Sequence, residues 1–272
     1  MLQLLPAPLA LRLEFYLYHH RLPHLNPPVT FSEKVVHRKM VDRDPRMPRL
    51  SDKILAKEYI SETLGKEWII PNLWTGEKLP PRSQRNWPIP FVLKATHGSG
   101  WNVFVRSENE LDWDRIEPFT DRWLRSTHAP RAKEWLYTQI RPRLLVEPFV
   151  GRGDVSPPDY KFHVFAGRTV CIQVDLDRYQ SHRQLFYDPE WKRLPYWYVC
   201  PFDEGHVDPP KSLPEMLRAA ELLGRDFPYV RVDLYEIDGR PMFGELTFYP
   251  NSGQVSFKPE SVELEFGRLW PV

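Results

Sequence analysis

Apolar residues recur at intervals of three to four in parts of this chain, and that spacing predicts amphipathic helices. The clearest pattern covers residues 52–63, with Ser51 as the candidate N-cap and Gly65 as the end. The predicted apolar face of this helix consists of Ile54, Leu55, Tyr59 and Ile60. Residues 109–140 also have a mostly helical pattern.

Two more helices are predicted from capping boxes, in which a hydroxyl residue precedes a glutamate by three positions. The pairs are Thr30 with Glu33, opening the segment 27–40, and Ser212 with Glu215, opening 214–223. Gly224 is the expected end of the second helix, because glycine readily adopts the left-handed conformation common at that position.

Short β-type segments occupy most of the rest of the chain. The predicted strands are 91–94, 101–105, 144–147, 160–165, 169–175, 230–237 and 242–248. Helices therefore come first, followed by a mixed sheet and then a mostly antiparallel sheet. This order predicts an α+β fold with two lobes and a cleft between them.

Composition narrows the class of protein. A chain of 272 residues suffices for one large domain or two small lobes. Its net charge of +1, without a basic stripe, argues against nucleic-acid binding. The 29 prolines mark irregular connections rather than disorder, because aromatic residues, 14% of the chain, are interspersed with them.

The N-terminal segment 4–17 is apolar but interrupted, which argues against a membrane span or a signal peptide. Its interruptions are Pro6, Pro8, Arg12 and Glu14. We expect a docked helix; peripheral attachment to a membrane or a partner is the alternative. The two cysteines, Cys171 and Cys200, lack metal-site spacing, so a reducing compartment, the cytoplasm, is expected.

The most informative stretch is the last quarter, where two predicted strands each place a carboxylate among apolar residues. Asp233 and Glu245 would be costly to bury without a compensating positive charge. A shared cation is one solution, and Mg²⁺ prefers such hard oxygen ligands together with substrate phosphates. A structural salt bridge with Arg231 or Lys258 is the alternative.

The turn between these strands sets a geometric condition. Asp238-Gly239 favours a two-residue hairpin loop, which would pair Asp233 with Gly244 and turn Glu245 to the opposite face. The two carboxylates share a face only if the loop has an odd number of residues or if a bulge intervenes.

Three further segments have features of a nucleotide site. Lys94 precedes the loop His97-Gly98-Ser99-Gly100, whose amide groups suit phosphate oxygens. Lys161 begins a strand and would contact a phosphate if it faces a cleft. Glu147-Pro148-Phe149-Val150 suits an adenine slot. The alternatives are an ordinary glycine hairpin, a solvent-facing lysine and strand-end packing.

One motif suggests other chemistry. Asp175-Leu176-Asp177 is the kind of pattern that holds the metal of a sugar-nucleotide site, although it is short and common. A serine nucleophile elbow and a thiol-hydrolase signature are absent from the sequence. A metal-dependent glycosyltransferase is therefore the second hypothesis for function.

Taken in order, these segments resemble the ATP-grasp superfamily, and more narrowly its TupA-like branch, which is associated with teichuronopeptide and other bacterial cell-surface polysaccharides. The similarity spans about residues 26–267. The strings that carry it are Thr30-Phe31-Ser32-Glu33-Lys34, Ser51-Asp52-Lys53, Lys94-Ala95-Thr96-His97-Gly98-Ser99-Gly100, Glu147-Pro148-Phe149-Val150, Lys161, Arg231-Val232-Asp233, Phe243-Gly244-Glu245-Leu246-Thr247-Phe248 and Pro250-Asn251-Ser252-Gly253.

The resemblance implies an ATP-dependent carboxylate–amine ligase with ATP and Mg²⁺ held in the cleft between two lobes. Residues 1–49 would form a shortened helical or irregular extension, 50–146 the N-terminal lobe with its glycine-rich lid loop, and 147–272 the C-terminal lobe with the metal-binding strands. The expected ATP-binding residues are Lys53, Lys94, His97, Gly98, Ser99, Gly100, Glu147, Phe149, Val150 and Lys161.

The resemblance also implies roles in the C-terminal lobe. Arg231 and Lys161 are the expected catalytic cations, and Mg²⁺ would be bound by Asp233, Glu245 and Asn251. Many ATP-grasp ligases carry Asn two residues after the metal glutamate, where this chain has Thr247, which puts a second metal ion in doubt.

A ligase of this kind activates a carboxylate as an acylphosphate, which an amine then attacks, with release of ADP and phosphate. The expected substrates are a carboxylate and an amine, each on a glycan or a small molecule used in surface-polysaccharide synthesis. The expected protein partners are other enzymes of that pathway. A non-catalytic nucleotide-binding protein is the third hypothesis.

Overall fold

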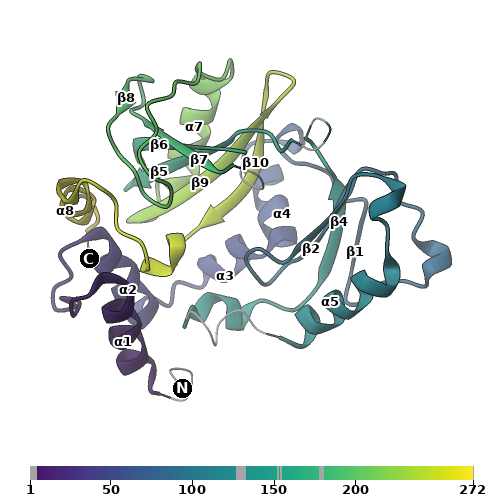
Figure 1. The fold of residues 1–272 in the computed structure, drawn as a ribbon, viewed down its shortest axis with the longest axis horizontal. Coiled ribbons are helices and arrows are strands. Elements are labelled where there is room, and N and C mark those ends of the chain that lie inside the picture. The colour runs from purple at the N-terminus through teal and green to yellow at the C-terminus, as the bar shows by residue number, and fades with distance from the viewer. Residues whose placement is uncertain (1–4, 127–132, 152, 154, 178–180, 272) are drawn as a thin grey trace. The chain divides into compact units, whose positions relative to one another are not determined.

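The computed structural model describes residues 5–126, 133–151, 153, 155–177 and 181–271. The chain divides into two compact units. The six-stranded unit comprises Met1–Arg43, Arg131–Glu134 and Pro157–Val272, and the four-stranded unit comprises Asp44–Pro130 and Trp135–Ser156. Both units mix helices with a sheet, so the predicted α+β class is confirmed (Figure 1).

The sheet of the six-stranded unit has the order β10-β9-β5-β6-β7-β8, with antiparallel neighbours throughout. Its strands are β5 (Asp159–Phe165), β6 (Arg168–Leu176), β7 (Arg183–Tyr187), β8 (Arg193–Leu194), β9 (Tyr229–Ile237) and β10 (Arg240–Thr247). The four strands predicted in this region are confirmed. β7 and β8 were not predicted.

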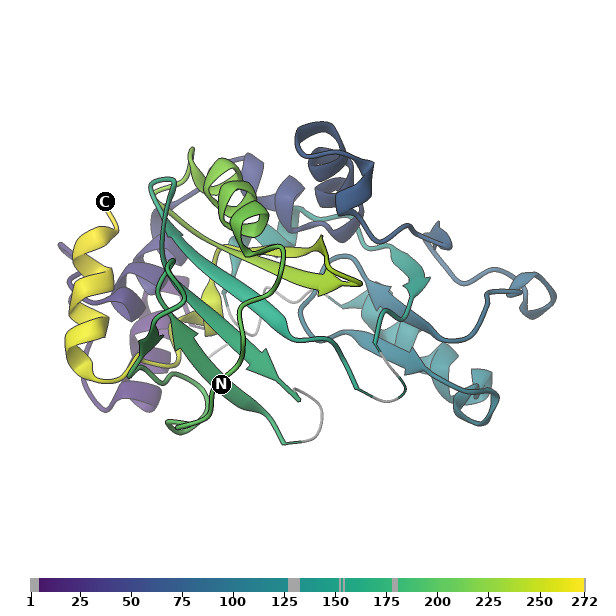
Figure 2. The same ribbon diagram turned by 90° about the horizontal axis from the view of Figure 1, so that it is seen from above.

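The two faces of this sheet differ in chemistry, because side chains alternate along each strand. Helix α7 (Leu213–Gly224) packs on the apolar face, where Gly224 lies against Val164 and Val230 (Figure 2). The opposite face carries charged side chains, and these form the site described below.

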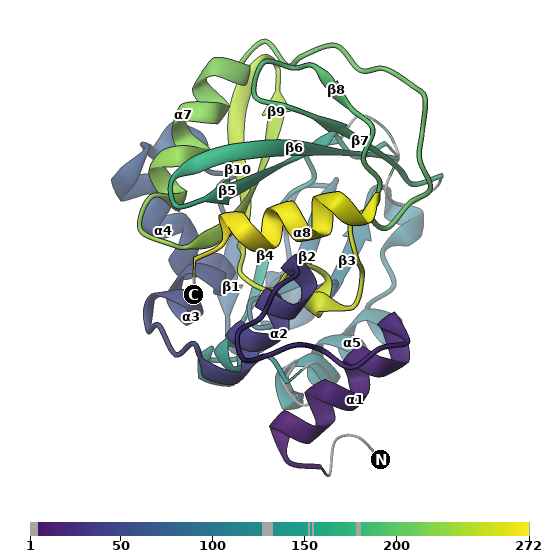
Figure 3. The ribbon, with the colours of Figure 1, turned by 90° about the vertical axis from the view of Figure 1, so that its left-hand side faces the viewer.

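Three helices complete the six-stranded unit: α1 (Ala7–His19), α2 (Phe31–Val41) and α8 (Glu260–Leu269). Figure 3 shows α2 and α8 side by side, and Phe31 of α2 contacts the rings of Tyr229, Phe257 and Phe266. The predicted docking of the N-terminal helix is confirmed, since Leu11 and Phe15 are buried.

The four-stranded unit contains a smaller antiparallel sheet of order β1-β4-β2-β3. Its strands are β1 (Trp74–Gly76), β2 (Phe91–Ala95), β3 (Asn102–Val105) and β4 (Leu144–Pro148), and its α-helices are α3 (Arg46–Ser51), α4 (Lys53–Thr63) and α5 (Trp113–Arg125). The three strands predicted here are confirmed, and Leu93, Leu144 and Val146 are in its core.

Short 3₁₀ turns occupy several connections: η2 (Lys66–Trp68), η3 (Arg82–Gln84), η4 (Glu108–Glu110), η5 (Trp135–Gln139) and η6 (Pro250–Gly253). The helical pattern predicted over 109–140 therefore corresponds to α5 and η5, and its residues 127–132 lie outside the described part of the chain. None of the described helices combines the length and apolar character needed to cross a membrane.

The predicted helix caps have mixed outcomes. The capping box of Thr30 and Glu33 is confirmed at the start of α2. Ser51 is the wrong cap for α4, because the Asp52 carboxylate accepts the first amide hydrogen bonds, at 2.8 and 3.1 Å. Ser212 is the N-cap residue of α7, but the predicted capping box with Glu215 is not formed, since the Ser212 hydroxyl donates to Glu236 (2.7 Å) instead.

Candidate functional site

The hairpin that carries Asp233 and Glu245, the two carboxylates predicted to bind a metal, has a two-residue loop. Asp238 and Gly239 both have positive φ, 51° and 76°, as a primed hairpin turn requires, and Ile237 pairs with Arg240. A regular ladder from this turn would place Glu245 and Asp233 on opposite faces.

A β-bulge corrects the alignment. The register shifts between Phe243 and Glu245, so that Gly244 is an extra residue and Glu245 lies directly opposite Asp233. A Cβ on Gly244 would lie 2.9 Å from the Asp233 carbonyl oxygen and 3.0 Å from the Tyr235 ring, so glycine alone fits without displacement. Of the two arrangements that the sequence left open, the protein adopts the bulge.

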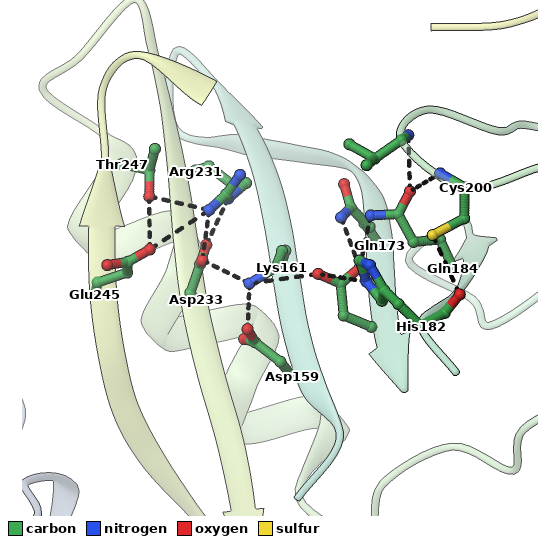
Figure 4. A network of polar contacts seen from close by, with 12 residues as sticks. Asp159, Lys161, Gln173, His182, Gln184, Cys200, Arg231, Asp233, Glu245 and Thr247 are labelled. Carbon is green, nitrogen blue, oxygen red and sulfur yellow. Dashed lines mark hydrogen bonds and ion pairs between the residues drawn. The ribbon is translucent and has the colours of Figure 1, made fainter. Parts of the chain in front are cut away.

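Two cations neutralise Asp233 on the charged sheet face (Figure 4). Its carboxylate accepts hydrogen bonds from Arg231 Nε and Nη2, both at 2.7 Å, and from Lys161 Nζ at 2.9 Å. Burial would raise the pKa of Asp233, but the charges of Arg231 and Lys161 hold it well below its usual range. Asp233 is therefore ionised at neutral pH.

Glu245 is the accessible member of the pair, with its side chain 45% exposed. Thr247 Oγ1 lies 3.3 Å from its carboxylate and accepts a hydrogen bond from Arg231 at 3.1 Å. Asp233 and Glu245 thus offer opposed hard oxygen atoms, a donor set that fits Mg²⁺. Thr247 adds an oxygen where many ATP-grasp ligases have Asn.

The third predicted metal ligand, Asn251, lies on a different element from Asp233 and Glu245. It is in η6 with a left-handed backbone, φ 44°, and in the described part of the chain it makes no hydrogen bond with Asp233 or Glu245. The described residues also contain no cluster of three or more histidine, cysteine or acidic side chains suited to a metal ion. Of the three predicted ligands, Asp233 and Glu245 are the pair that the sheet register places opposite one another.

The ammonium group of Lys161 forms ion pairs with three carboxylates. Its side chain is 2% exposed, and its Nζ contacts Asp159, Asp233 and, at 3.8 Å, Asp175. Burial alone would lower the pKa of Lys161, but Asp159 and Asp233 raise it. In this arrangement Lys161 neutralises the sheet face. Its predicted contact with a phosphate would require exchange of these partners.

The Asp-x-Asp motif, predicted as a possible sugar-nucleotide metal site, lies at the edge of this face, and Asp159 beside Lys161 was not predicted. Asp175, from the Asp-x-Asp motif, accepts hydrogen bonds from Gln173 (2.8 Å) and Gln184 (2.9 Å). Asp177 follows the end of β6 with a left-handed backbone, φ 48°. Asp175 thus belongs to a network within the sheet. Period-two alternation from Lys161 could have identified Asp159.

A second charged cluster lies in the four-stranded unit. Glu147, at the end of β4, accepts hydrogen bonds from Lys94 and, at 2.6 Å, from Lys57. Burial raises the pKa of Glu147, but Lys94 and Lys57 outweigh it and lower the pKa to about 2. Lys57 also donates to Ile70 O and Asn72, while Lys94 is 27% exposed. Sequence reasoning missed Lys57.

The glycine loop is anchored from two sides. Lys53 Nζ donates to Gly98 O at 2.7 Å, and His97 Nε2 lies 2.9 Å from Trp123 O. His97 is buried, which lowers its pKa, so this histidine supports the loop from within. Gly100 has φ 71°, a conformation that glycine adopts without strain. The loop residues Ser99 and Gly100 are exposed.

The predicted adenine segment follows Glu147 directly. The Phe149 ring meets Phe104 edge to face at 5.9 Å, and Val150 is half-buried. Lys53, Lys94, the glycine loop, Glu147 and Phe149 thus lie in the four-stranded unit, whereas Lys161, Arg231, Asp233 and Glu245 lie in the six-stranded unit.

Comparison with solved structures gives low similarity to ligases. D-alanine–D-alanine ligase from Bacillus anthracis with ATP matches at 14% identity and a TM-score of 0.45, covering 81% of this chain and 62% of that one. L-amino acid ligase from Bacillus licheniformis matches at 11% identity and a TM-score of 0.46, covering 91% of this chain and 55% of that one. The ATP-grasp ligase PsnB, in complex with minimal precursor, Mg and ADP, matches at 14% identity and a TM-score of 0.42. The match covers 80% of this chain and 57% of that one.

The chain thus spans roughly three-fifths of the length of these solved proteins. No curated protein matches the sequence. The model of the TupA-like ATP-grasp family, in contrast, matches residues 33–270, which include both charged clusters. The chain therefore belongs to the TupA-like ATP-grasp family.

Proposed function

We propose that this protein is an ATP-dependent carboxylate–amine ligase that forms an acylphosphate and releases ADP and phosphate. We further propose that it modifies a bacterial cell-surface polysaccharide or its precursor. The observation that carries the proposal is the alignment of Asp233 opposite Glu245 by a β-bulge. It gains its meaning from the chain's membership of the TupA-like ATP-grasp family. The family supports the ligase chemistry, and the branch supports the glycan substrate.

In the six-stranded unit, Asp233 and Glu245 would hold Mg²⁺, which when bound would neutralise phosphate oxygens of ATP. Arg231 is placed to stabilise negative charge beside them, because its guanidinium contacts Asp233 and Thr247 and lies 3.6 Å from Glu245. Its hydrogen bonds to Asp233 keep the guanidinium fixed before a substrate arrives.

In the four-stranded unit, Lys53 and Lys94 would contact phosphates and the loop 97–100 would cover them. Lys53 Nζ already donates a hydrogen bond to Gly98 O in the loop. The position of the loop would therefore depend on whether the Lys53 ammonium group contacts Gly98 or a phosphate. Glu147, Phe149 and Val150 would hold the adenine. Excluding water around the acylphosphate would protect it from hydrolysis.

The proposal is tested by a thermal-shift panel of Mg·ATP, Mg·ADP and UDP-, GDP- and CMP-linked sugars. A nucleotide at about 100 times its dissociation constant adds about 2.7 kcal/mol to the free energy of unfolding. We expect stabilisation by the adenine nucleotides in the wild type. We expect little in Glu245→Gln, which changes a half-exposed side chain, and full stabilisation in the control Glu265→Gln, on an exposed part of α8.

The chemical step is tested by release of ADP with candidate carboxylates and amines. Stabilisation by sugar nucleotides alone would reject the ligase in favour of a glycosyltransferase. Unchanged ATP turnover in Asp233→Asn would reject the assigned metal site.

A further inference from the structure

The charged face of the six-stranded sheet ends at a histidine that the proposed site has not used. Lys161 Nζ lies 2.9 Å from Asp233 Oδ2 and 3.8 Å from Asp175 Oδ2, and that same oxygen lies 3.6 Å from His182 Nε2. These contacts place His182 Nε2 within about 10 Å of the proposed metal ligand Asp233. Figure 4 shows His182 across the sheet from Arg231 and Glu245.

Two glutamine side chains orient the Asp175 carboxylate toward this histidine. Its Oδ1 accepts hydrogen bonds from Gln173 (2.8 Å) and Gln184 (2.9 Å), which leaves Oδ2 directed at Lys161 and His182. Burial raises the pKa of Asp175, but the nearby His182 imidazole and the charge of Lys161 lower it to about 2. Asp175 is therefore an anion at neutral pH.

The histidine is also held through its backbone. Gln184 accepts hydrogen bonds from the amides of Val199 (2.9 Å) and Cys200 (3.1 Å), and Cys200 Sγ donates to the His182 carbonyl at 3.3 Å. The same glutamine thus orients Asp175 and fixes the segment that supports His182.

His182 reaches solvent while its partner does not. Its side chain is 27% exposed and that of Asp175 is 3% exposed. Since Nε2 faces Asp175, Nδ1 is the ring nitrogen left for a substrate. His182 Nε2 lies no more than about 10 Å from Asp233 Oδ2, so the two residues are close enough to act on one substrate.

Resting on the ligase function proposed above, we propose that His182 is the general base for the amine, with Asp175 as its positioning residue. The amine nitrogen attacks the acylphosphate carbonyl carbon, a C–N bond forms, and the C–O bond to phosphate breaks with its electron pair leaving on phosphate. The alkylammonium nitrogen gives one proton to His182 Nδ1 before it attacks and its second proton to the leaving phosphate, and Asp175 stabilises the imidazolium. The substrate is accordingly an alkylamine, which needs such a base.

The test compares two nucleophiles on one acylphosphate. The wild type, with Mg·ATP and the carboxylates that support ADP release, is given either hydroxylamine or a primary alkylamine. Hydroxylamine is largely unprotonated at neutral pH and traps acylphosphates as hydroxamates without a base. We expect His182→Ala to keep hydroxamate formation within about threefold of wild type, while amide formation falls by about 10² to 10⁴-fold.

Two variants sharpen the result. Added imidazole should restore amide formation in His182→Ala, and Asp175→Asn should reduce amide formation more than hydroxamate formation. His206→Ala is the matched control, because His206 lies 3.4 Å from Asp208 on the exposed surface, and it should leave both products unchanged.

The outcomes separate the two proposals. Equal loss of hydroxamate and amide in His182→Ala would overturn the general base, as would unchanged formation of both. Absence of hydroxamate from the wild type with every carboxylate offered would overturn the ligase function, and the role of His182 with it.

Discussion

At the scale of single residues, two buried carboxylates of this protein stay charged because each is paired with two cations. Asp233 is shared by Arg231 and Lys161, and Glu147 by Lys57 and Lys94. Removing one partner of a buried ion pair leaves the other uncompensated, which costs far more than an exposed pair is worth. Stability and ligand binding therefore depend on different members of each cluster.

The two lysines around Glu147 should separate these effects. Lys57→Met should lower the free energy of unfolding by about 3–5 kcal/mol, because Lys57 is buried and also donates to Ile70 O and Asn72. Lys94→Met should change stability much less, since Lys94 is 27% exposed, but should weaken Mg·ATP binding at least tenfold. Urea unfolding and titration calorimetry measure the two quantities, and the reverse pattern would contradict these roles.

Glu134 should make stability depend on pH. Burial raises its pKa to about 7, against the lowering effect of Lys39. Between about pH 4.5 and 7 the folded protein keeps a proton that the unfolded chain has lost. Its stabilising contribution, complete below pH 4.5, is therefore lost as pH rises to 7, by about 3 kcal/mol in total.

Urea unfolding across pH 4–8 measures this loss. Glu134→Gln, which stays neutral, should flatten the profile in that window, whereas Glu265→Gln on the exposed surface should leave it unchanged. A slope that persists in Glu134→Gln would assign it to another group.

At the scale of elements, the hairpin of β9 and β10 decides whether the proposed metal site exists. Both strands and their two-residue turn follow from the sequence, because alternation and Asp238-Gly239 are local signals. The bulge at Gly244 does not, because a glycine in a strand is compatible with either a bulge or a regular ladder. The bulge forms where Gly244 packs closely against the Asp233 backbone and the Tyr235 ring of the neighbouring strand. Contacts between strands are not visible in the local sequence pattern.

Gly244→Ala should therefore lower stability by about 1–3 kcal/mol and weaken stabilisation by Mg·ATP, since the new methyl group displaces the strand that carries Asp233. Gly239→Asn is the control in the same hairpin, because a side chain there meets open space and asparagine tolerates positive φ. Thermal shifts with and without Mg·ATP compare the two, and equal behaviour would contradict the role of the bulge.

Sequence patterns predicted other elements unevenly for similar reasons. The capping box of Thr30 is a local arrangement and is present. Ser212 has the same spacing, but Glu236 of the neighbouring strand takes its hydroxyl and its amide. Strand β7 escaped prediction because it is short and does not alternate between buried and exposed positions, since Gln184 to Tyr187 are all buried. The contact of Gln184 with Asp175 escaped prediction with it.

At the scale of the whole molecule, the first 43 residues belong to the same unit as the last 116. Phe31 is the clearest link, since it is fully buried among Tyr229, Phe257 and Phe266. The six-stranded unit is therefore completed by segments from both ends of the sequence, and the four-stranded unit lies between them along the chain.

Phe31→Ala should lower the free energy of unfolding by about 3–5 kcal/mol through the cavity that it leaves. Hydrogen exchange should show lost protection in β5 and β9, with much smaller changes in β2 and β4. Phe202→Ala, at a side chain 43% exposed in the same unit, is the control. Equal loss of protection in both sheets would contradict this division.

The bulge also has a consequence for how the hairpin tolerates changes in length. An added residue at the tip, beside Gly239, can be absorbed by a longer loop, so the strand pairs nearer Asp233 keep their partners. A residue added between Gly244 and Glu245 has no such outlet and would turn the glutamate away from Asp233. Natural variation in length should therefore collect at the tip of this hairpin, while the spacing from Phe243 to Thr247 stays constant.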